Sequence, residues 1–188
     1  HIEAATTTGV FYAIQTLRQL IKKDGKNLQC PYVEITDSPA FGWRGFLLDE
    51  ARNFQGKNEV KKLLDEMALL KMNVFHWHLT DDQGWRIEIK EYPLLTEIGG
   101  RRDSTQLNWY ESTVYDGKPV SGYYSQKDIR EIIAYAADRH IKIIPEIEFP
   151  GHASAAIAAY PWLSCSKKQI SVPCGYGVLT TAFNVVNP

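Results

Sequence analysis

Apolar positions along this chain follow two patterns, short continuous runs and longer stretches in which apolar residues recur every three or four positions. The continuous runs are residues 45–48, 73–79 and 141–147, and they predict strands that are covered on both faces, as in a parallel sheet. Helical spacing covers residues 9–21, 58–72 and 125–139, and the Ala-rich stretch 153–159 predicts a shorter helix.

From residue 43 onward the predicted strands and helices alternate, which indicates an α/β fold with parallel strands and crossover helices. Three strands are too few to close a barrel, for which eight are usual. The connection 80–122 has little periodicity, and a connection of that length in a compact domain is usually functional. Residues 160–188 are expected to be mostly loop.

The first 40 residues differ from the rest, because no strand–helix alternation is visible in them. We expect Asp24-Gly25 to end the helix 9–21, residues 32–35 to form a short strand, and Asp37-Ser38-Pro39 to form a turn. A domain boundary near Pro39 would divide the chain into residues 1–40 and 41–188.

Acidic residues and histidines follow the second strand, at the edge where α/β sheets usually place their chemistry. His76 and His78 share one face of this strand, and Asp81-Asp82 comes directly after it. The two histidines either begin a metal site or are buried and orient a site without metal through hydrogen bonds. The two aspartates either divide acid and base roles or are solvated loop acids.

The third strand places Glu146 and Glu148 on one face, and a buried glutamate is rare unless it is paired. We expect Arg52 and His152, each just past a strand end, to be their partners. The planar guanidinium of Arg52 suits hydroxyl groups or a carboxylate, and an ion pair with an acid at the end of the first strand is the alternative.

Aromatic rings flank the long connection, where they either stack on sugar rings or anchor the loop. They are Trp85, Trp109, Tyr110, Tyr115, Tyr123 and Tyr124. Two adjacent Asp-Glu pairs resemble catalytic dyads. Asp65-Glu66 is expected on the solvated side of a helix, and Asp49-Glu50 ends the first strand, where the two side chains must point apart.

Composition narrows the range of partners. A net charge of −1 gives no reason to expect a nucleic-acid partner, and no apolar run approaches the roughly 20 residues of a membrane span. Three cysteines make no disulfide framework: Cys165 and Cys174 either pair across one loop or stay reduced, and Cys30 would be free. Neither end has a natural boundary signal, so we expect a piece of a longer protein.

Three stretches of the chain carry a resemblance to a known family: residues 44–52 (RGFLLDEAR), 76–86 (HWHLTDDQGWR) and 145–152 (PEIEFPGH), in this order. They resemble the first three barrel strands of glycoside hydrolase family 20, the β-N-acetylhexosaminidases. The likeness extends from about Trp43 to the C-terminus, and residues 1–40 look like the tail of a small α/β domain that precedes the barrel in many members. The resemblance implies an incomplete TIM (β/α)8-type barrel of about three βα units.

In the family, the substrate's own 2-acetamido oxygen attacks the anomeric carbon, and an adjacent Asp-Glu pair after the fourth strand supplies the acid and holds the acetamide. By position, the resemblance implies that Arg52, Asp81, His152 and Trp85 bind the terminal sugar. Position 148 is Glu where many members have Asp. The supporting hydrogen-bond network would consist of Asp81, His152, Glu148 and His78.

The resemblance implies a parent enzyme that releases terminal β-linked N-acetylhexosamine (GlcNAc or GalNAc) from glycans, with no cofactor and no metal. No Asp-Glu pair of this chain follows a fourth strand, so we expect the chain alone to be inactive. The alternatives are a metal-dependent hydrolase and a non-catalytic sugar-binding fragment. We also expect self-association through uncovered barrel edges and, by analogy, an extracellular, periplasmic or lysosome-like compartment. The metal site would use His76, His78, Asp81 and His152.

Overall fold

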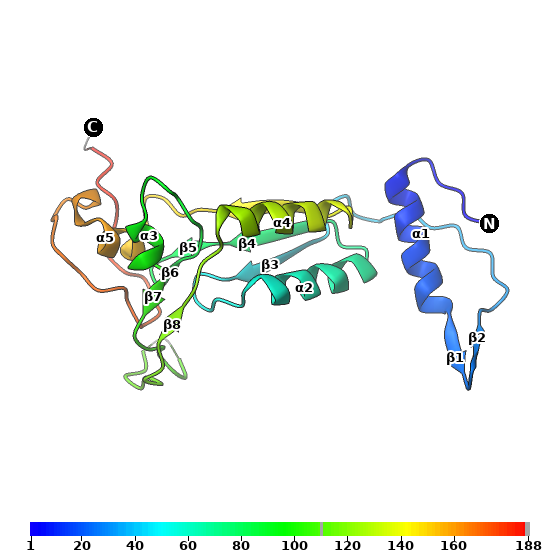
Figure 1. The fold of residues 1–188 in the computed structure, drawn as a ribbon, viewed down its shortest axis with the longest axis horizontal. Helices are drawn as coiled ribbons and strands as arrows, with labels where there is room; N and C mark the ends of the chain where they lie inside the picture. The colour runs from blue at the N-terminus through cyan, green and yellow to red at the C-terminus, as the bar shows by residue number, and fades with distance from the viewer. Residues whose placement is uncertain (110, 187–188) are drawn as a thin grey trace.

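The computed structural model describes residues 1–109 and 111–186. Its centre is a three-stranded parallel sheet in the order β3 (Gly45–Asp49), β4 (Val74–His78) and β9 (Lys142–Glu146). The crossover helices are α2 (Lys57–Leu69) and α4 (Gln126–Ala137), which pack beside each other along the sheet (Figure 1). The predicted parallel strands with crossover helices are therefore present, and no closed barrel forms within the described residues.

The core lies between this sheet and its two helices. The alternation along β4 turns Phe75 and Trp77 towards the helices, where both are at most 1% exposed. From α2 and α4 the core receives Val60, Leu64, Met67, Ile132 and Ala136. Three residues that helical spacing places on these buried faces are exposed instead: Leu70, which lies past the end of α2, Ile133, which is 50% exposed, and Ala137.

The N-terminal segment forms α1 (Thr7–Leu20) and a hairpin of β1 (Lys22–Asp24) and β2 (Asn27–Gln29), which lie at the opposite end of the sheet from the long connection (Figure 1). Asp24-Gly25 therefore does not end the helix. Gly25 adopts a φ of +59° in the hairpin turn, a conformation that suits glycine. The strand expected at 32–35 is also wrong, because these exposed residues have no partner strand among the described residues.

The connection 80–122 is built from short elements. They are the hairpin β5 (Thr80–Asp81) and β6 (Gly84–Trp85), the helix α3 (Leu94–Glu97), and the antiparallel pair β7 (Arg101–Arg102) and β8 (Val120–Ser121). Beyond β9, α5 (Ser154–Ala159) is fully buried, and a 3₁₀ turn covers Pro161–Leu163. A second apolar core unites α3, α5 and β6 around Trp85.

Several smaller expectations are also decided. Cys30, Cys165 and Cys174 are all free thiols. None of the helices in the described residues is long and apolar enough to cross a membrane. Of the aromatic residues around the connection, Trp109, Tyr115 and Tyr123 are exposed, Tyr124 is buried, and Tyr110 lies outside the described residues.

Candidate functional site

The site forms where β3, β4 and β9 end, because parallel strands bring their carboxyl ends to one edge. Asp49 and His78 are register partners on neighbouring strands and share this edge. The chain then continues from β3 to Arg52, from β4 to Asp81, and from β9 to His152. Three segments that are distant in sequence thus contribute side chains to one cluster.

Asp81 is the centre of the cluster, and its side chain is only 2% exposed. Its Oδ2 atom lies 2.6 Å from Nη2 of Arg52 and 3.3 Å from Nε2 of His78. Its Oδ1 atom lies 3.0 Å from Nδ1 of His152. The β5–β6 hairpin fixes this carboxylate, and the backbone N–H of Asp82 donates to Oδ1 as well. The expected meeting of Arg52, Asp81 and His152 is present in the structure.

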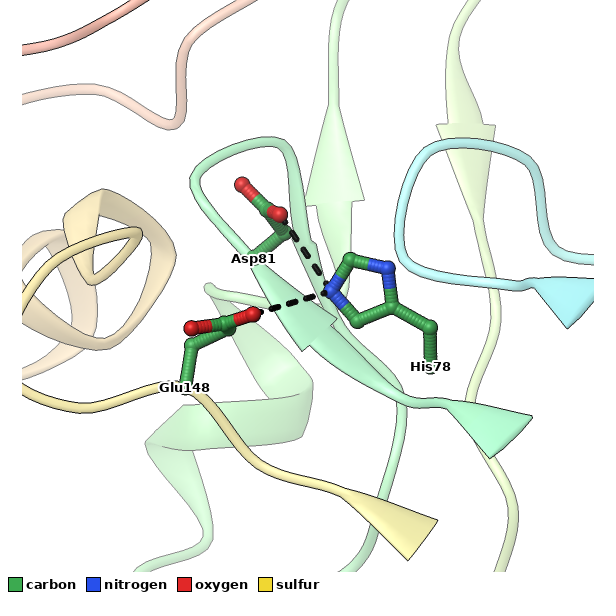
Figure 2. Close-up of side chains that lie close together, drawn as sticks. All are labelled: His78, Asp81 and Glu148. Carbon is green, nitrogen blue, oxygen red and sulfur yellow. Dashed lines mark ion pairs between the residues drawn. The ribbon is translucent and has the colours of Figure 1, made fainter. Parts of the chain in front are cut away.

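His78 lies between carboxylates on both sides of its ring. Figure 2 shows Nε2 directed towards Asp81 and towards Glu148, whose Oε1 atom is 3.7 Å away. On the other side, Nδ1 is 3.5 Å from Oδ1 of Asp49. Glu148 is held by its backbone, since its N–H donates to the hydroxyl of Thr80 at 2.9 Å. The imidazole therefore lies between carboxylates from the ends of the first and third strands.

The pKa values follow from this crowding of acids. Burial disfavours the charged form of His78, but the hydrogen bond to Asp81 and the charge of Asp49 outweigh burial and raise the pKa of His78. Burial would raise the pKa of Asp81, but hydrogen bonds and the nearby Arg52 lower it overall. Burial and the neighbouring Glu146 carboxyl raise the pKa of Glu148. Burial and the contacts within the cluster therefore shift the pKa values of all three groups.

Arg52 is oriented by three groups at once. Its Nη1 atom donates to Oδ2 of Asp49 at 2.9 Å, its Nε atom donates to Oε1 of Gln83 at 2.9 Å, and its Nη2 atom pairs with Asp81. Its side chain is still 25% exposed. The ion pair with Asp49, which was the alternative interpretation, is thus present on a side chain that also contacts Gln83 and Asp81. Arg52 is not the partner expected for Glu146 and Glu148.

His152 adopts a φ of +49°, in the left-handed region that non-glycine residues rarely occupy. Its Nδ1 atom lies 3.0 Å from Asp81 and 3.3 Å from Oδ2 of Asp82. Asp82 also accepts hydrogen bonds from the N–H and the hydroxyl of Ser154, at 3.0 and 2.6 Å. The two aspartates therefore differ in their partners: Asp81 contacts Arg52, His78 and His152, whereas Asp82 contacts His152 and fixes Ser154 in the segment that follows it.

Two expectations about individual residues need correction. His76 does not join His78, because its Nε2 atom pairs with Oε2 of Glu146 at 2.6 Å. Trp85 does not line the site: it is 8% exposed, lies in the second core and donates its ring N–H to Ile87 O at 2.7 Å. A ring buried on this scale supports the loop and has no free face for a sugar.

Metal binding is a weak fit to this geometry. Two trios have ligand atoms within 4.8 Å of one another, His78–Asp81–Glu148 and Asp81–Asp82–His152, and His76 belongs to neither. Both trios share Asp81, and a guanidinium already lies 2.6 Å from that carboxylate. A cation there would be repelled by Arg52, which supplies the positive charge itself.

Sequence reasoning missed the buried polar residues behind the site. Glu50 is 0% exposed and accepts from Tyr124 Oη and Gln55 N, each at 2.8 Å. Arg86 is 0% and Arg102 is 2% exposed. The signal was available in part, since Arg86 and Arg102 lie within the predicted functional connection, but the carbonyl partners of Arg86 are 14 to 36 residues away in sequence.

Comparison with known proteins was decisive for the family. The model of glycosyl hydrolase family 20, catalytic domain, matches residues 41–188, and the model of glycosyl hydrolase family 20, domain 2, matches residues 1–38. A β-hexosaminidase of Porphyromonas gingivalis is 48% identical over 177 residues, which are 90% of this chain and 22% of the relative. An N,N'-diacetylchitobiase of Vibrio harveyi is 42% identical over 84% of this chain and 18% of the relative.

Solved structures agree. A β-N-acetylhexosaminidase from Bacteroides fragilis superposes with a TM-score of 0.79 at 45% identity, over 97% of this chain and 33% of that one. An exo-β-N-acetylglucosaminidase from Vibrio harveyi, in complex with N-acetylglucosamine, gives 0.81 at 41% identity, over 97% and 29%. The chain thus spans a third or less of these relatives. On the match of the family model to most of its residues, this chain belongs to glycosyl hydrolase family 20.

Proposed function

We propose that the protein containing this chain is a retaining exo-β-N-acetylhexosaminidase and that residues 41–188 form the first three βα units of its (β/α)8 barrel. The observation that supports this most is the convergence of Arg52, Asp81 and His152 at the carboxyl edge of one parallel sheet. In (β/α)8 barrels this edge is where catalytic side chains are found. Similarity to β-hexosaminidases and chitobiase supports a terminal N-acetylhexosamine as the substrate.

Arg52 is the residue that we assign to the hydroxyl groups of the terminal sugar. Its guanidinium is braced by Asp49, Asp81 and Gln83, and its side chain is 25% exposed. Arginine donors fixed in one plane can bind neighbouring hydroxyls with little loss of side-chain freedom. Binding by a braced arginine favours one orientation of the sugar ring.

Asp81 and His152 form a pair that we assign to the support of the general acid. The Nδ1 atom of His152 lies 3.0 Å from Asp81, and we assign the other ring nitrogen, Nε2, to the contact with the acid. An aspartate that binds one ring nitrogen of a histidine fixes the orientation of the ring and determines which nitrogen carries the proton. The 45% exposure of the His152 side chain is consistent with a neighbour supplied by a strand beyond β9.

Hydrolysis in this proposal is assisted by the substrate, whose 2-acetamido oxygen attacks the anomeric carbon. Most glycosidases instead use two carboxylates of the protein, one as the acid and one as the base or nucleophile. The Asp-Glu pair that protonates the leaving group and holds the acetamide belongs to a fourth strand. Within this chain, Asp49-Glu50 cannot replace it, because Asp49 binds Arg52 while Glu50 is fully buried beneath Tyr124. The chain alone therefore contains the proposed sugar-binding residues but lacks the general acid.

The experiment compares the natural gene product with residues 1–188, using an aryl β-N-acetylglucosaminide. The proposal expects turnover by the gene product, none above blank by the short chain, and a loss of about 10²-fold or more in kcat/KM for Arg52→Met. The matched control is Arg44→Met, since Arg44 binds Lys71 O and Phe41 O at the opposite end of the strands. Turnover by the short chain, or equal losses in both variants, would refute it.

A glycan-degrading enzyme of this kind fits an extracellular, periplasmic or lysosome-like compartment, and we propose such a location. Fractionation of the producing cells with an antibody against this chain tests it. Recovery of the protein in the cytosolic fraction alone would contradict it.

A further inference from the structure

Arg86 is a fully buried arginine that does not touch the cluster around Asp81. It follows the β5–β6 hairpin, and its exposed fraction is 0%. Its guanidinium donates to four backbone carbonyls: Nε to Glu50 O (3.1 Å), Nη2 to Ala51 O (2.9 Å), and Nη1 to Gly100 O (2.6 Å) and Gly122 O (3.1 Å). One side chain thus fixes three separate loops.

The charge on Arg86 persists despite its burial. Burial and the nearby Arg102 lower the pKa of Arg86 to about 10, which still leaves the guanidinium protonated at pH 7. Burying a cation is unfavourable unless fixed dipoles or charges compensate it. The carbonyls can do so only while the loops hold them in place, so the cation and the loops stabilise each other.

Two of the four carbonyls belong to Glu50 and Ala51, the residues that lead directly into Arg52. The same peptide is held from the other side, because the N–H groups of Glu50 and Ala51 both donate to His78 O, at 3.1 and 3.2 Å. The turn that presents Arg52 is therefore clamped between the end of β4 and the Arg86 guanidinium.

Gly84 makes this clamp sterically feasible. A Cβ atom at position 84 would collide with Ala51 O and with the guanidinium carbon of Arg86. The absence of a side chain therefore lets Arg86 reach the turn before Arg52. A single methyl group at this position would act on the clamp without altering any charged residue.

We propose that Arg86 is a positioning residue for sugar binding, which holds the turn 49–52 so that Arg52 can contact Asp81 and a sugar hydroxyl together. This inference rests on the proposed function. It does not make Arg86 a catalytic residue, since its donors are all directed to the backbone. A misplacement of about 1 Å in a group that orients the substrate can lower a rate by roughly 10²-fold.

The test is a double-mutant cycle in the natural gene product, with Arg86→Lys made both in the wild type and in the Arg52→Met background. If Arg86 acts through Arg52, the lysine variant lowers kcat/KM by about 10-fold or more in the wild type, mainly by raising KM. It lowers kcat/KM by less than about threefold once Arg52 is gone. Gly84→Ala should show the same dependence on Arg52.

Arg44→Lys is the matched control, because it also donates to backbone carbonyls but lies at the other end of the strands. It should give equal effects in both backgrounds. Equal losses for Arg86→Lys in both backgrounds, or an Arg86→Lys chain that does not fold, would overturn the inference, because the role would then be general stability. An inactive wild type would instead refute the proposed function.

Discussion

Asp81 faces three basic side chains while almost no water reaches it. Arg52, His78 and His152 all lie within 3.3 Å of its two oxygens, and the carboxylate is 2% exposed. When one partner of a buried ion pair is removed, the other charge stays buried without compensation. The resulting destabilisation is larger than the stabilisation that the intact pair supplied. At the residue scale, this carboxylate is thus the point at which the three strand ends depend on one another.

Asp81→Asn is expected to lower the free energy of unfolding of this chain by about 3 kcal/mol. The amide keeps the shape of the side chain but removes the negative charge that faces Arg52 and His152. Urea denaturation followed by tryptophan fluorescence measures the change. Asp65→Asn is the control: Asp65 pairs with Arg139 on an exposed helix face, and its loss should cost about 1 kcal/mol or less. Similar values for the two variants would contradict the central role of Asp81.

His78 is expected to titrate above its ordinary pKa of 6.5, since Asp81 and Asp49 stabilise the imidazolium more than burial opposes it. A histidine with a raised pKa binds its proton more tightly in the folded chain. Its contribution to stability is then complete below pH 6.5 and is lost as the pH rises through the folded pKa. NMR of the ring protons across this range measures it, and the Asp81→Asn variant should lower the value. A His78 pKa that does not respond to Asp81→Asn would exclude the pairing.

At the element scale, α4 shows how a short sequence signal fixes the start of a helix. Ser125 accepts from the N–H of Asp128, and the Asp128 carboxylate accepts from the N–H of Ser125, which is a capping box. Lys57 and Ser125 lower the pKa of Asp128 to about 2, so the box stays intact at neutral pH. The helix in turn packs against β9 and contributes Ile132 and Ala136 to the core that lies against the sheet.

Ser125→Ala is expected to lower the free energy of unfolding by about 1 kcal/mol, because the backbone N–H of Asp128 loses its acceptor at the start of α4. Thermal and urea unfolding of this chain provide the measurement. Ser171→Ala, in an exposed loop, is the control and should stay within about 0.5 kcal/mol of the wild type. A loss no larger than that of the control would show that the cap is dispensable.

Local patterns were sufficient for the elements around the sheet, because each depends on periodicity within a dozen residues. The strands expected at residues 73–79 and 141–147 are present as β4 and β9, each shorter by one residue at both ends. The convergence of Arg52 and Asp81 also followed, since parallel strands end together. The prediction of a strand at residues 32–35 was wrong for the opposite reason. A strand needs a hydrogen-bonded partner strand, and these residues have none among those that the structure describes.

The interior of the long connection was beyond sequence reasoning. Trp85 and Arg86 are neighbours, and the structure buries both, one in an apolar core and one among carbonyls. The neighbouring sequence does not distinguish burial of Trp85 and Arg86 from a tryptophan ring and an arginine that face solvent. The partners of Arg86 lie 14 to 36 residues away, so its role depends on tertiary structure alone.

At the scale of the whole molecule, the residues that the structure describes cover only one face of the sheet. The register aligns Leu47, His76 and Ile144 on the face opposite the helices, and Leu47 is 49% exposed. Neither β3 nor β9 has a further strand beside it among the described residues. An apolar groove of about 360 Å³ also runs between α4 and β9, lined by Ile133 and Ile143 among others.

Open edges and apolar faces of this kind promote association between chains, because an unpaired strand can accept hydrogen bonds from another copy. We therefore expect residues 1–188 to self-associate at micromolar concentrations, and sedimentation velocity over a dilution series measures this. Ile144→Lys places a charge on the uncovered face of the edge strand β9 and should shift the population towards monomer. Lys142→Arg keeps the charge on the same strand and should leave association unchanged. A wild-type chain that stays monomeric throughout the series would show that the strand edges are protected by the chain's own loops.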